Sequence, residues 1–320
     1  MCIPDVKNGQ LYRQTRDTYD AAFTSKSKAN RRNQAKAYLS FMISYKLNYM
    51  SPDLIDILMF VQFLTNSFKS PQTVKNYLSG AKTFVIEAGG NYQQFLASMV
   101  RNMVRGVDKL SKHCVTQAPA LSVPFIKKVC DQLRLLSDIG RVAAAMVLFV
   151  FATYLRQSNV AYTPDGFNHM VKRSDISFST NHMWIHVRST KTIRSSKGVV
   201  IPVKRSNSVY CPVRAYEEAL SLSRGSSNSY AFTEPGSNRP LYATKVNMLL
   251  RAVATSLRHP LAKAISLHSL RRSAAQACAS LGISEEEIRD HGTWKSGAIY
   301  TYVPKIIFTK VPAAVASLLV

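Results

Sequence analysis

The chain has 320 residues, 46% of them apolar, so it is long enough for one large or two ordinary globular domains. Its 42 Lys and Arg residues against 18 Asp and Glu residues give a formal net charge of +24. Both parts of the chain are basic, since residues 1–117 carry a net +9 and residues 118–320 a net +15. This excludes a neutral domain with a basic tail and predicts a nucleic-acid partner, which the protein would surround.

Cysteine usage and hydropathy predict an intracellular protein. The five cysteines are odd in number and contain no CxxC pair, so neither a disulfide framework nor a zinc site is expected. The longest apolar run, 142–152, is too short to span a bilayer and predicts a buried helix, so no membrane contact is expected. The N-terminus resembles no signal peptide, and the basic cluster at 26–32 is compatible with nuclear import in a eukaryotic host or with a DNA-facing helix.

The first third of the chain has the apolar spacing of helices. Helices are expected over residues 35–49, 54–68, 74–88 and 92–107. Ser51 is expected to cap the second of these, with Pro52 in its first turn, and Ser70-Pro71 repeats this signal before the third. Residues 1–117 therefore predict a compact bundle of four or five helices.

An uncharged stretch with two prolines, 116–124, reads as the linker to a second domain over 118–320. Two helices are expected after it, at 124–136 and 141–155. The β-rich segments 176–178, 183–187 and 199–203 then predict a small antiparallel sheet. Helical patterns resume at 211–223, 243–257, 268–281 and 284–290. The predicted fold class is mainly α with a small antiparallel β-sheet (α+β).

Several residues of the second domain are candidates for chemistry, although each is weak alone. Arg156 follows the most apolar helix and would need a partner if buried, unless it extends to the surface. Lys191 lies in a predicted turn between strands, where a solvated basic turn is the simpler interpretation. His268 and Arg271 stand three residues apart, on one face of a predicted helix, and could point at one phosphate.

The order of these residues is more informative than any one of them. An arginine, a hairpin lysine, an HxxR motif, a tryptophan (Trp294) and a tyrosine eight residues later (Tyr302) follow one another. This arrangement resembles the tyrosine recombinase (phage integrase) family over about residues 150–304. The segment 283–294 resembles the approach to the active-site tryptophan of Cre-like members, and 292–296 with Tyr302 is similar to crypton and DIRS-type mobile-element recombinases.

The resemblance implies a helical DNA-binding domain, a catalytic domain and a role for each motif residue. Arg156 and Arg271 would bind the scissile phosphate, Lys191 would be the general acid, and His268 would be the histidine of the HxxR motif. Trp294 would take the position that is histidine in many relatives, and Tyr302 would be the nucleophile. The enzyme would cleave and rejoin DNA through a covalent 3′-phosphotyrosine, with no metal, cofactor or ATP.

Two departures from the family pattern stand out. Many relatives have an acidic residue three positions after the first arginine, where this chain has Asn159. The distance from Trp294 to Tyr302 is one residue shorter than the commonest spacing in bacterial members. Because His291 to Tyr300 also gives a compatible spacing, Tyr300 stays open as the alternative nucleophile.

Partners follow from charge and from the C-terminal segment. Double-stranded DNA is the expected partner, with phosphate contacts from basic residues of the N-terminal helices: Lys26, Lys28, Arg31, Arg32, Lys75 and Lys82. The apolar, uncharged segment 311–320 is suited to docking on a neighbouring subunit, as is common in the family, so a homotetramer on two DNA sites is expected. The alternatives are a type IB topoisomerase-like enzyme and a non-enzymatic DNA-binding derivative.

Overall fold

A computed structural model describes residues 10–113, 117–163, 169–188, 198–294 and 296–303. The chain divides into two compact units, Met1–Val115 and Thr116–Val320. This division falls close to the expected boundary after residue 117. Each unit has its own apolar core. A role for the first unit in DNA binding stays a prediction.

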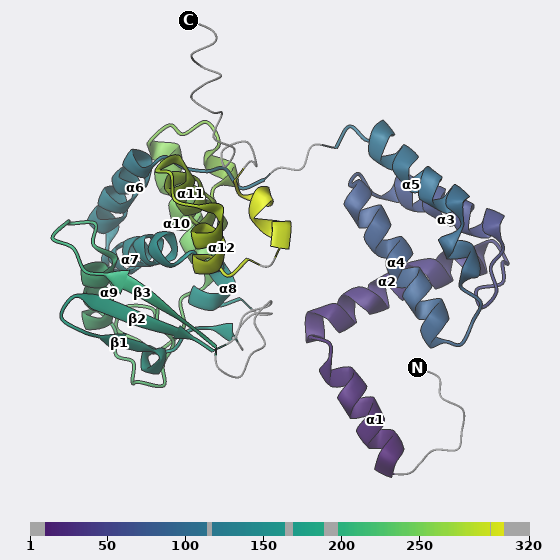
Figure 1. The fold of residues 1–320 in the computed structure, drawn as a ribbon, viewed down its shortest axis with the longest axis horizontal. Coiled ribbons are helices and arrows are strands. Elements are labelled where there is room, and N and C mark those ends of the chain that lie inside the picture. The colour runs from purple at the N-terminus through teal and green to yellow at the C-terminus, as the bar shows by residue number, and fades with distance from the viewer. Residues whose placement is uncertain (1–9, 114–116, 164–168, 189–197, 295, 304–320) are drawn as a thin grey trace, which may run out of the picture. The chain divides into compact units, whose positions relative to one another are not determined.

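The first unit is helical in its described part (Figure 1). Its elements are α1 Gln10–Ala21, α2 Ser25–Ser44, α3 Leu54–Ser67, α4 Pro71–Glu87, the 3-10 helix η1 Gln93–Leu96 and α5 Ser98–Leu110. Tyr38 of α2 lies at the centre of the core, with its ring against Phe60, Phe84 and Phe95. Aromatic packing between helices that are distant in sequence therefore holds this bundle together.

The expected helices of this unit are present, but several of their ends were predicted wrongly. The cap of α3 is Asp53 rather than Ser51, and Pro52 lies outside the helix. Asp53 and Asp56 form a reciprocal capping box, in which each carboxylate accepts a 2.9 Å bond from the other's backbone N–H. Helix α2 begins ten residues before the expected 35, at Ser25, after Thr24 caps it. The expected helix over 92–107 divides into η1 and α5, and α1 was not predicted.

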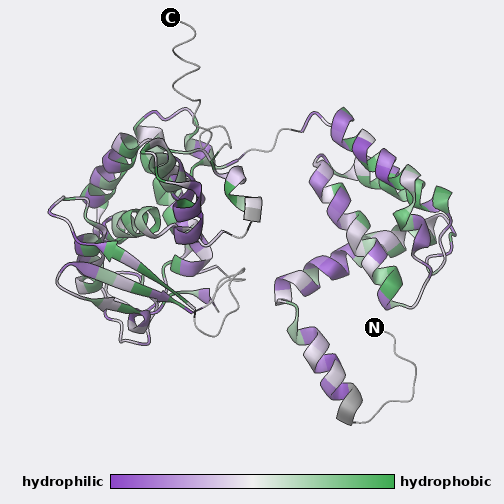
Figure 2. Cartoon of the chain, in the orientation of Figure 1, coloured by the Kyte–Doolittle hydropathy of each residue, from purple (hydrophilic) through white to green (hydrophobic). Residues whose placement is uncertain are grey.

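The second unit surrounds α7 (Asp138–Thr153) with helices (Figures 1 and 2). Eleven residues of α7 are buried, and the helix contacts α6 (Val123–Leu136), α9 (Pro212–Ser221) and α11 (Leu267–Ser280). The apolar run at 142–152 therefore forms a core helix, as predicted. The remaining helices are α8 Gln157–Val160, η3 Arg173–Asp175, α10 Ala243–Ser256, η4 Ala262–Ala264, α12 Glu285–His291 and η5 Ser296–Thr301.

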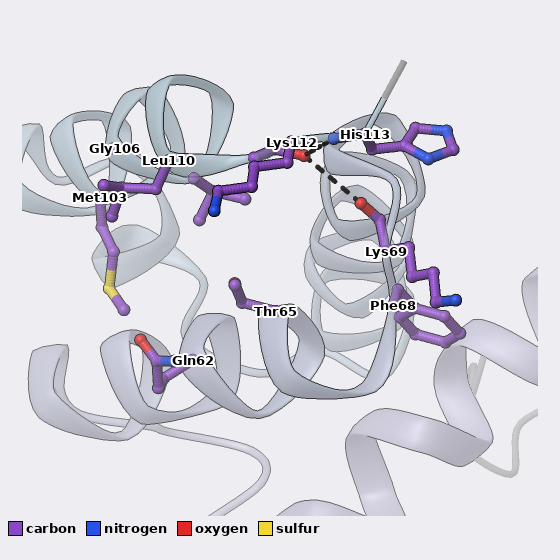
Figure 3. Close-up of a pocket in the computed structure, with 11 residues that line it drawn as sticks. Gln62, Thr65, Phe68, Lys69, Met103, Gly106, Leu110, Lys112 and His113 are labelled. Carbon is purple, nitrogen blue, oxygen red and sulfur yellow. Dashed lines mark hydrogen bonds between the residues drawn. The ribbon is translucent and has the colours of Figure 1, made fainter. Parts of the chain in front are cut away.

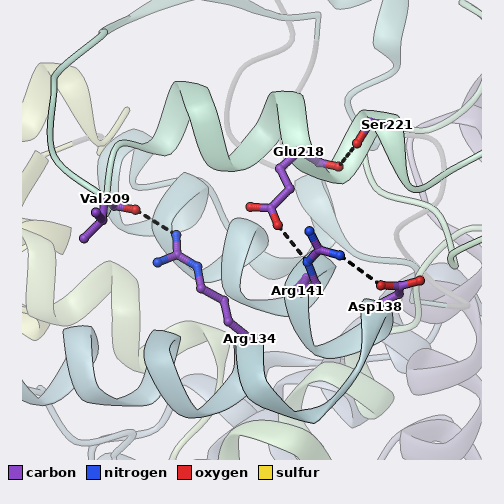
Figure 4. A network of polar contacts seen from close by, with 6 residues as sticks. All are labelled: Arg134, Asp138, Arg141, Val209, Glu218 and Ser221. Carbon is purple, nitrogen blue, oxygen red and sulfur yellow. Dashed lines mark hydrogen bonds and ion pairs between the residues drawn. The ribbon is translucent and has the colours of Figure 1, made fainter.

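A polar network at the surface joins α7 to α9 (Figure 4). Arg141 donates from Nε to Glu218 at 2.8 Å and from Nη1 to Asp138 at 3.2 Å. Arg134 of α6 donates to the carbonyl of Val209, which precedes α9, at 2.9 Å. Because these side chains are partly exposed, the ion pairs of this network contribute little to stability.

The three predicted strands form one antiparallel sheet in the order β1-β2-β3. They are β1 Ile176–Phe178, β2 His182–Val187 and β3 Val199–Lys204. Ile185 pairs with Ile176 on one side and Ile201 on the other, and these side chains face the core. The predicted class, mainly α with a small antiparallel sheet, is therefore confirmed. In the part of the chain that the structure describes, no helix is long and apolar enough to cross a membrane.

The close packing of α6 on α7 depends on Gly140. A Cβ atom there would lie 2.1 Å from the backbone oxygen of Leu133, so Gly140→Ala must push the two helices apart. We expect a loss of about 1–3 kcal/mol in the free energy of unfolding, measured by urea denaturation. Gly106→Ala in α5 is the control, because a Cβ there meets no atom within 4 Å. It should stabilise the protein by about 0.5–1 kcal/mol. Equal effects of the two substitutions would contradict the packing argument.

Candidate active site

The guanidinium of Arg271 lies at the centre of the candidate site. Arg271 belongs to α11 and is only 1% exposed. Its Nη2 donates to the carbonyl of Gly292 at 2.7 Å, and its Nη1 donates to the carbonyl of Tyr154. Tyr154 is the C-cap of α7, in the left-handed conformation (φ 54°), and Gly292 is the C-cap of α12. One buried cation therefore bonds to the C-terminal ends of two helices, where carbonyls lack helical partners and cations are favoured.

Aromatic rings cover this guanidinium. The Cζ atom of Arg271 lies 4.2 Å from the ring centroid of Trp294 and 5.5 Å from that of Tyr302. The rings of Trp294 and Tyr302 are 4.9 Å apart, and the ring of His268 is 5.3 Å from Tyr302. Four of the predicted catalytic residues thus meet in one cluster, with cation–π distances that favour a charged guanidinium.

Gly292 makes room for Trp294 in this cluster. A Cβ atom at position 292 would lie 1.9 Å from the indole ring, so no other residue fits without moving the tryptophan. Trp294 is 5% exposed and also packs near Tyr154, at a centroid distance of 6.0 Å. The glycine two positions before Trp294 therefore has a steric reason.

The structure separates the two candidate nucleophiles. Tyr302 lies beside His268, Arg271 and Trp294, with its ring centroid 5.5 Å from the Cζ atom of Arg271. The Tyr300 hydroxyl instead donates to the carboxylate of Glu285, at 2.9 Å from each oxygen. That hydrogen bond raises the pKa of Tyr300, which works against the formation of a phenolate.

Burial and neighbouring positive charge change the titration of the cluster. Burial, and after it the charge of Arg156, lowers the pKa of Arg271 to about 10, against the opposing influence of Tyr302. Burial also lowers the pKa of His268, with the charges of Arg271, Arg272 and Arg156 acting in the same direction. His268 is therefore neutral at neutral pH and can accept a proton. Arg156, the N-cap of α8, is partly exposed and acts electrostatically on both residues.

Three buried N–H groups at this site have no hydrogen-bond partner in the structure: Nε of Arg271, Nε of Arg272 and Nε1 of Trp294. Buried donors are rarely left unpaired in folded proteins. Donors of this kind, two of them on cations, match the oxygens of an anion such as a phosphodiester. Within the described ranges, no three His, Cys, Asp or Glu residues come together as a group that could hold a metal ion.

Two further residues singled out in the sequence are Lys191 and Asn159. Lys191 lies outside the described residues, in the connection between β2 and β3, whose ends pair at Val187 and Val199. Asn159 is 1% exposed and donates to the carbonyl of His169 at 2.9 Å, so it joins α8 to the chain near residue 169.

Three residues that help to build the site were not predicted from the sequence. Tyr154 contributes the carbonyl that binds Arg271, and its own hydroxyl donates to Cys278 Sγ at 2.7 Å. Arg272 and Gln276 of α11 bond to the backbone beside Tyr302. Helical spacing from His268 could have identified the last two, since positions i, i+4 and i+8 share a face. Nothing in the sequence distinguishes Tyr154, because its left-handed conformation is seen only in the fold.

The predicted DNA-contacting cations of the first unit have different environments. Arg31 is ion-paired with Glu87 and stacks on Phe23 at 4.3 Å. Lys75 pairs with Asp108 at 2.7 Å, and Lys28 pairs with Asp20 at 3.3 Å. The remaining members of the set are Arg32 and Lys26, which are exposed, and Lys82, which is half-buried.

A cavity of about 630 Å³ lies between α3 and α5 of the first unit (Figure 3). Its walls include Phe68, Met103 and Leu110, with Lys69 and His113 at one end. None of the residues predicted to be catalytic lines this cavity.

Comparison with known proteins identifies the fold. No protein-family model matches the chain, and no curated protein matches its sequence. Among solved structures, the Tn1549 transposon integrase in complex with circular intermediate DNA is similar over 97% of this chain and 98% of its own, with a TM-score of 0.65 and 13% identity. A lambda integrase dimer bound to a COC′ core site matches 93% of this chain and 76% of its own (TM-score 0.58, 13% identity).

A third similar structure is the XerH site-specific recombinase bound to a palindromic difH substrate in a post-cleavage complex. It covers 80% of this chain and 68% of its own, with a TM-score of 0.54 and 13% identity. The protein therefore has the fold of the tyrosine recombinases and integrases, as the motif order predicted.

The lowered pKa of His268 predicts a stability that depends on pH. The unfolded chain binds a proton at the ordinary histidine pKa of 6.5, whereas the folded chain resists protonation. Stability from this residue is therefore full above pH 6.5 and is lost as the pH falls through the lowered folded pKa. Urea unfolding from pH 7.5 to 5 should show a decrease that His268→Asn reduces. An unchanged pH dependence in this variant would contradict the lowered pKa of His268 in the folded protein.

Proposed function

We propose that this protein is a site-specific recombinase of a mobile element, which cleaves and rejoins duplex DNA with Tyr302 as nucleophile. The observation that carries the proposal is the position of the Tyr302 ring among His268, Arg271 and Trp294. The fold, shared with integrases and recombinases solved in complex with DNA, supports the same class.

The scissile phosphate is proposed to bind over this cluster. Partly exposed Arg156 would contact a non-bridging oxygen, while the unpaired Nε1 of Trp294 and the buried charge of Arg271 would stabilise the negative charge that grows in the transition state. Arg271 is bonded to two main-chain carbonyls, so its place in the cluster is set before any DNA binds. Preorganised cations of this kind can stabilise the transition state without a metal ion.

The proton transfers follow from the neighbours of Tyr302. The Tyr302 oxygen attacks phosphorus and forms the phosphotyrosine bond, while its phenolic proton passes to neutral His268. The bond to the 5′ oxygen breaks, and Lys191 is proposed to protonate that leaving group. The 3′-phosphotyrosine retains the phosphodiester bond energy, so attack by a 5′-hydroxyl reverses the chemistry without ATP.

The expected assembly belongs to the same proposal. A homotetramer would join two DNA sites, with the apolar segment 311–320 docked on a neighbouring subunit, although that segment lies outside the described residues.

A type IB topoisomerase-like activity is the second candidate function, since it uses the same arginine, lysine, histidine and tyrosine groups. It would relax a supercoiled duplex without site preference.

A suicide substrate tests the nucleophile. Nicked DNA that carries the element's own ends should trap a covalent adduct with the wild-type protein, because the cleaved strand diffuses away. Tyr302→Phe should abolish the adduct, since its ring keeps the packing but lacks the attacking oxygen. Tyr300→Phe is the matched control and should form the adduct, because its hydroxyl faces Glu285. The opposite pattern would move the assignment to Tyr300, and an adduct with both variants would overturn the mechanism.

Salt dependence tests the contribution of the first unit. Arg32 is exposed, and a phosphate contact from it would release about one counterion. Arg32→Ala should therefore weaken DNA binding for all sequences and reduce the slope of log K against log salt by about 1. Lys75→Ala is the comparison, because Lys75 is paired with Asp108, and its slope should change less. Titration by fluorescence anisotropy at several salt concentrations measures both slopes, and an unchanged Arg32→Ala slope would exclude this contact.

A further inference from the structure

One face of α11 contacts the segment of chain that carries Tyr302. His268 and Arg271 lie on this helix, and Arg272 and Gln276 follow at helical spacing on the same side. Arg272 donates from Nη2 to the carbonyl of Thr301 at 2.7 Å. Gln276 donates from Nε2 to the carbonyl of Tyr302 at 2.8 Å. Two side chains of α11 thus hold the backbone immediately before and at the proposed nucleophile.

Those two carbonyls lie where the 3-10 helix η5 (Ser296–Thr301) ends. Carbonyls at a helix end have no partner from their own helix and need one from outside. The guanidinium of Arg272 is also favoured there by the negative end of the helix, and its Cζ lies 5.8 Å from the Tyr302 ring. Arg272 therefore contacts both the backbone and the ring of the tyrosine segment.

Apolar packing also holds the same segment. Ile299 and Val303 are both fully buried in a cluster with Ala274 and Ala275 of α11. Tyr302 itself is only partly buried, so its ring can face a substrate while its flanking residues are held. Without the two polar contacts, the apolar anchors would still retain the segment, but the backbone could turn about them.

We propose that Arg272 and Gln276 are positioning residues, a two-point clamp that sets the orientation of the Tyr302 hydroxyl toward the phosphate. This inference rests on the proposed function. A displacement of about 1 Å in a reacting group can lower a rate by about a hundredfold, so backbone contacts at the nucleophile matter for the chemical step. Loss of the Gln276 contact, which removes no charge, should act on cleavage and leave DNA affinity nearly unchanged.

Gln276→Met is the sharpest test, because it keeps the length of the side chain, removes the N–H donor and changes no charge. Its single-turnover cleavage rate on the suicide substrate should fall about tenfold or more, while the Kd for the same DNA changes by less than about twofold. Gln132→Met, at an exposed position of α6, is the matched control and should cleave at the wild-type rate. Cleavage by Gln276→Met within about twofold of wild type would overturn the clamp.

A modified substrate separates positioning from acid catalysis. A bridging 5′-phosphorothiolate leaves without a proton donor, because a thiolate is a far better leaving group than an alkoxide. It should restore cleavage by Lys191→Ala, which lacks the proposed acid, but not cleavage by Gln276→Met. Full recovery of Gln276→Met on this substrate would overturn the clamp, since the defect would then lie in the leaving-group step.

The Arg272 variants supply a second, independent measurement. Arg272→Met should reduce cleavage as Gln276→Met does, and Arg272→Lys should restore a large part of it, because an ammonium can still donate to the Thr301 carbonyl. If thermal unfolding shows that Gln276→Met does not fold, the cleavage rates of Arg272→Met and Arg272→Lys test the clamp by the same criteria. A wild-type protein that forms no adduct contradicts the proposed function itself, whereas a wild-type adduct with undiminished variants contradicts only the clamp.

Discussion

The burial of one positive charge, on Arg271, is the constraint on which the rest of the site depends. A guanidinium withdrawn from water is costly unless its donors are paired. The C-terminal carbonyls of α7 and α12 provide that pairing through Tyr154 and Gly292. The two helices must therefore end where they do, and Tyr154 must adopt its left-handed conformation, for the charge to be accommodated. The same charge then orders the Trp294 and Tyr302 rings that lie over it.

Helix α11 converts this local constraint into a complete site. It carries the proposed base, His268, the buried Arg271 and the two side chains that hold the tyrosine segment. It is itself held at Ser273, whose buried hydroxyl accepts the backbone N–H of Leu121 at 2.7 Å and donates to Ser269. Groups placed on one packed helix keep their mutual distances better than groups on loops, as the chemistry proposed here requires.

Most of the fold could be predicted from the sequence, because hydrophobic periodicity determined which segments bury a face. The core helix α7, the three strands and α9 to α12 lie where apolar spacing placed them. Predictions of helix starts were weaker where several caps compete. Ser51 and Asp53 are both good caps, and only the reciprocal contact with Asp56 selects Asp53. The beginning of α2 was missed because its first two turns are polar and lack an apolar stripe.

The sequence by itself predicted the fold and the proposed class of chemistry, since the order Arg156, Lys191, His268, Arg271, Trp294 and Tyr302 resembles one family. It favoured Tyr302 as the nucleophile and left Tyr300 open, because both lie at a plausible spacing from a preceding motif. Only the tertiary structure showed that Tyr302 lies against Arg271 and that Tyr300 bonds to Glu285. It also revealed Tyr154, Arg272 and Gln276, which act through a backbone carbonyl or upon one. Sequence spacing reports which side chains share a helix face, whereas contacts between separate elements are decided by how those elements pack.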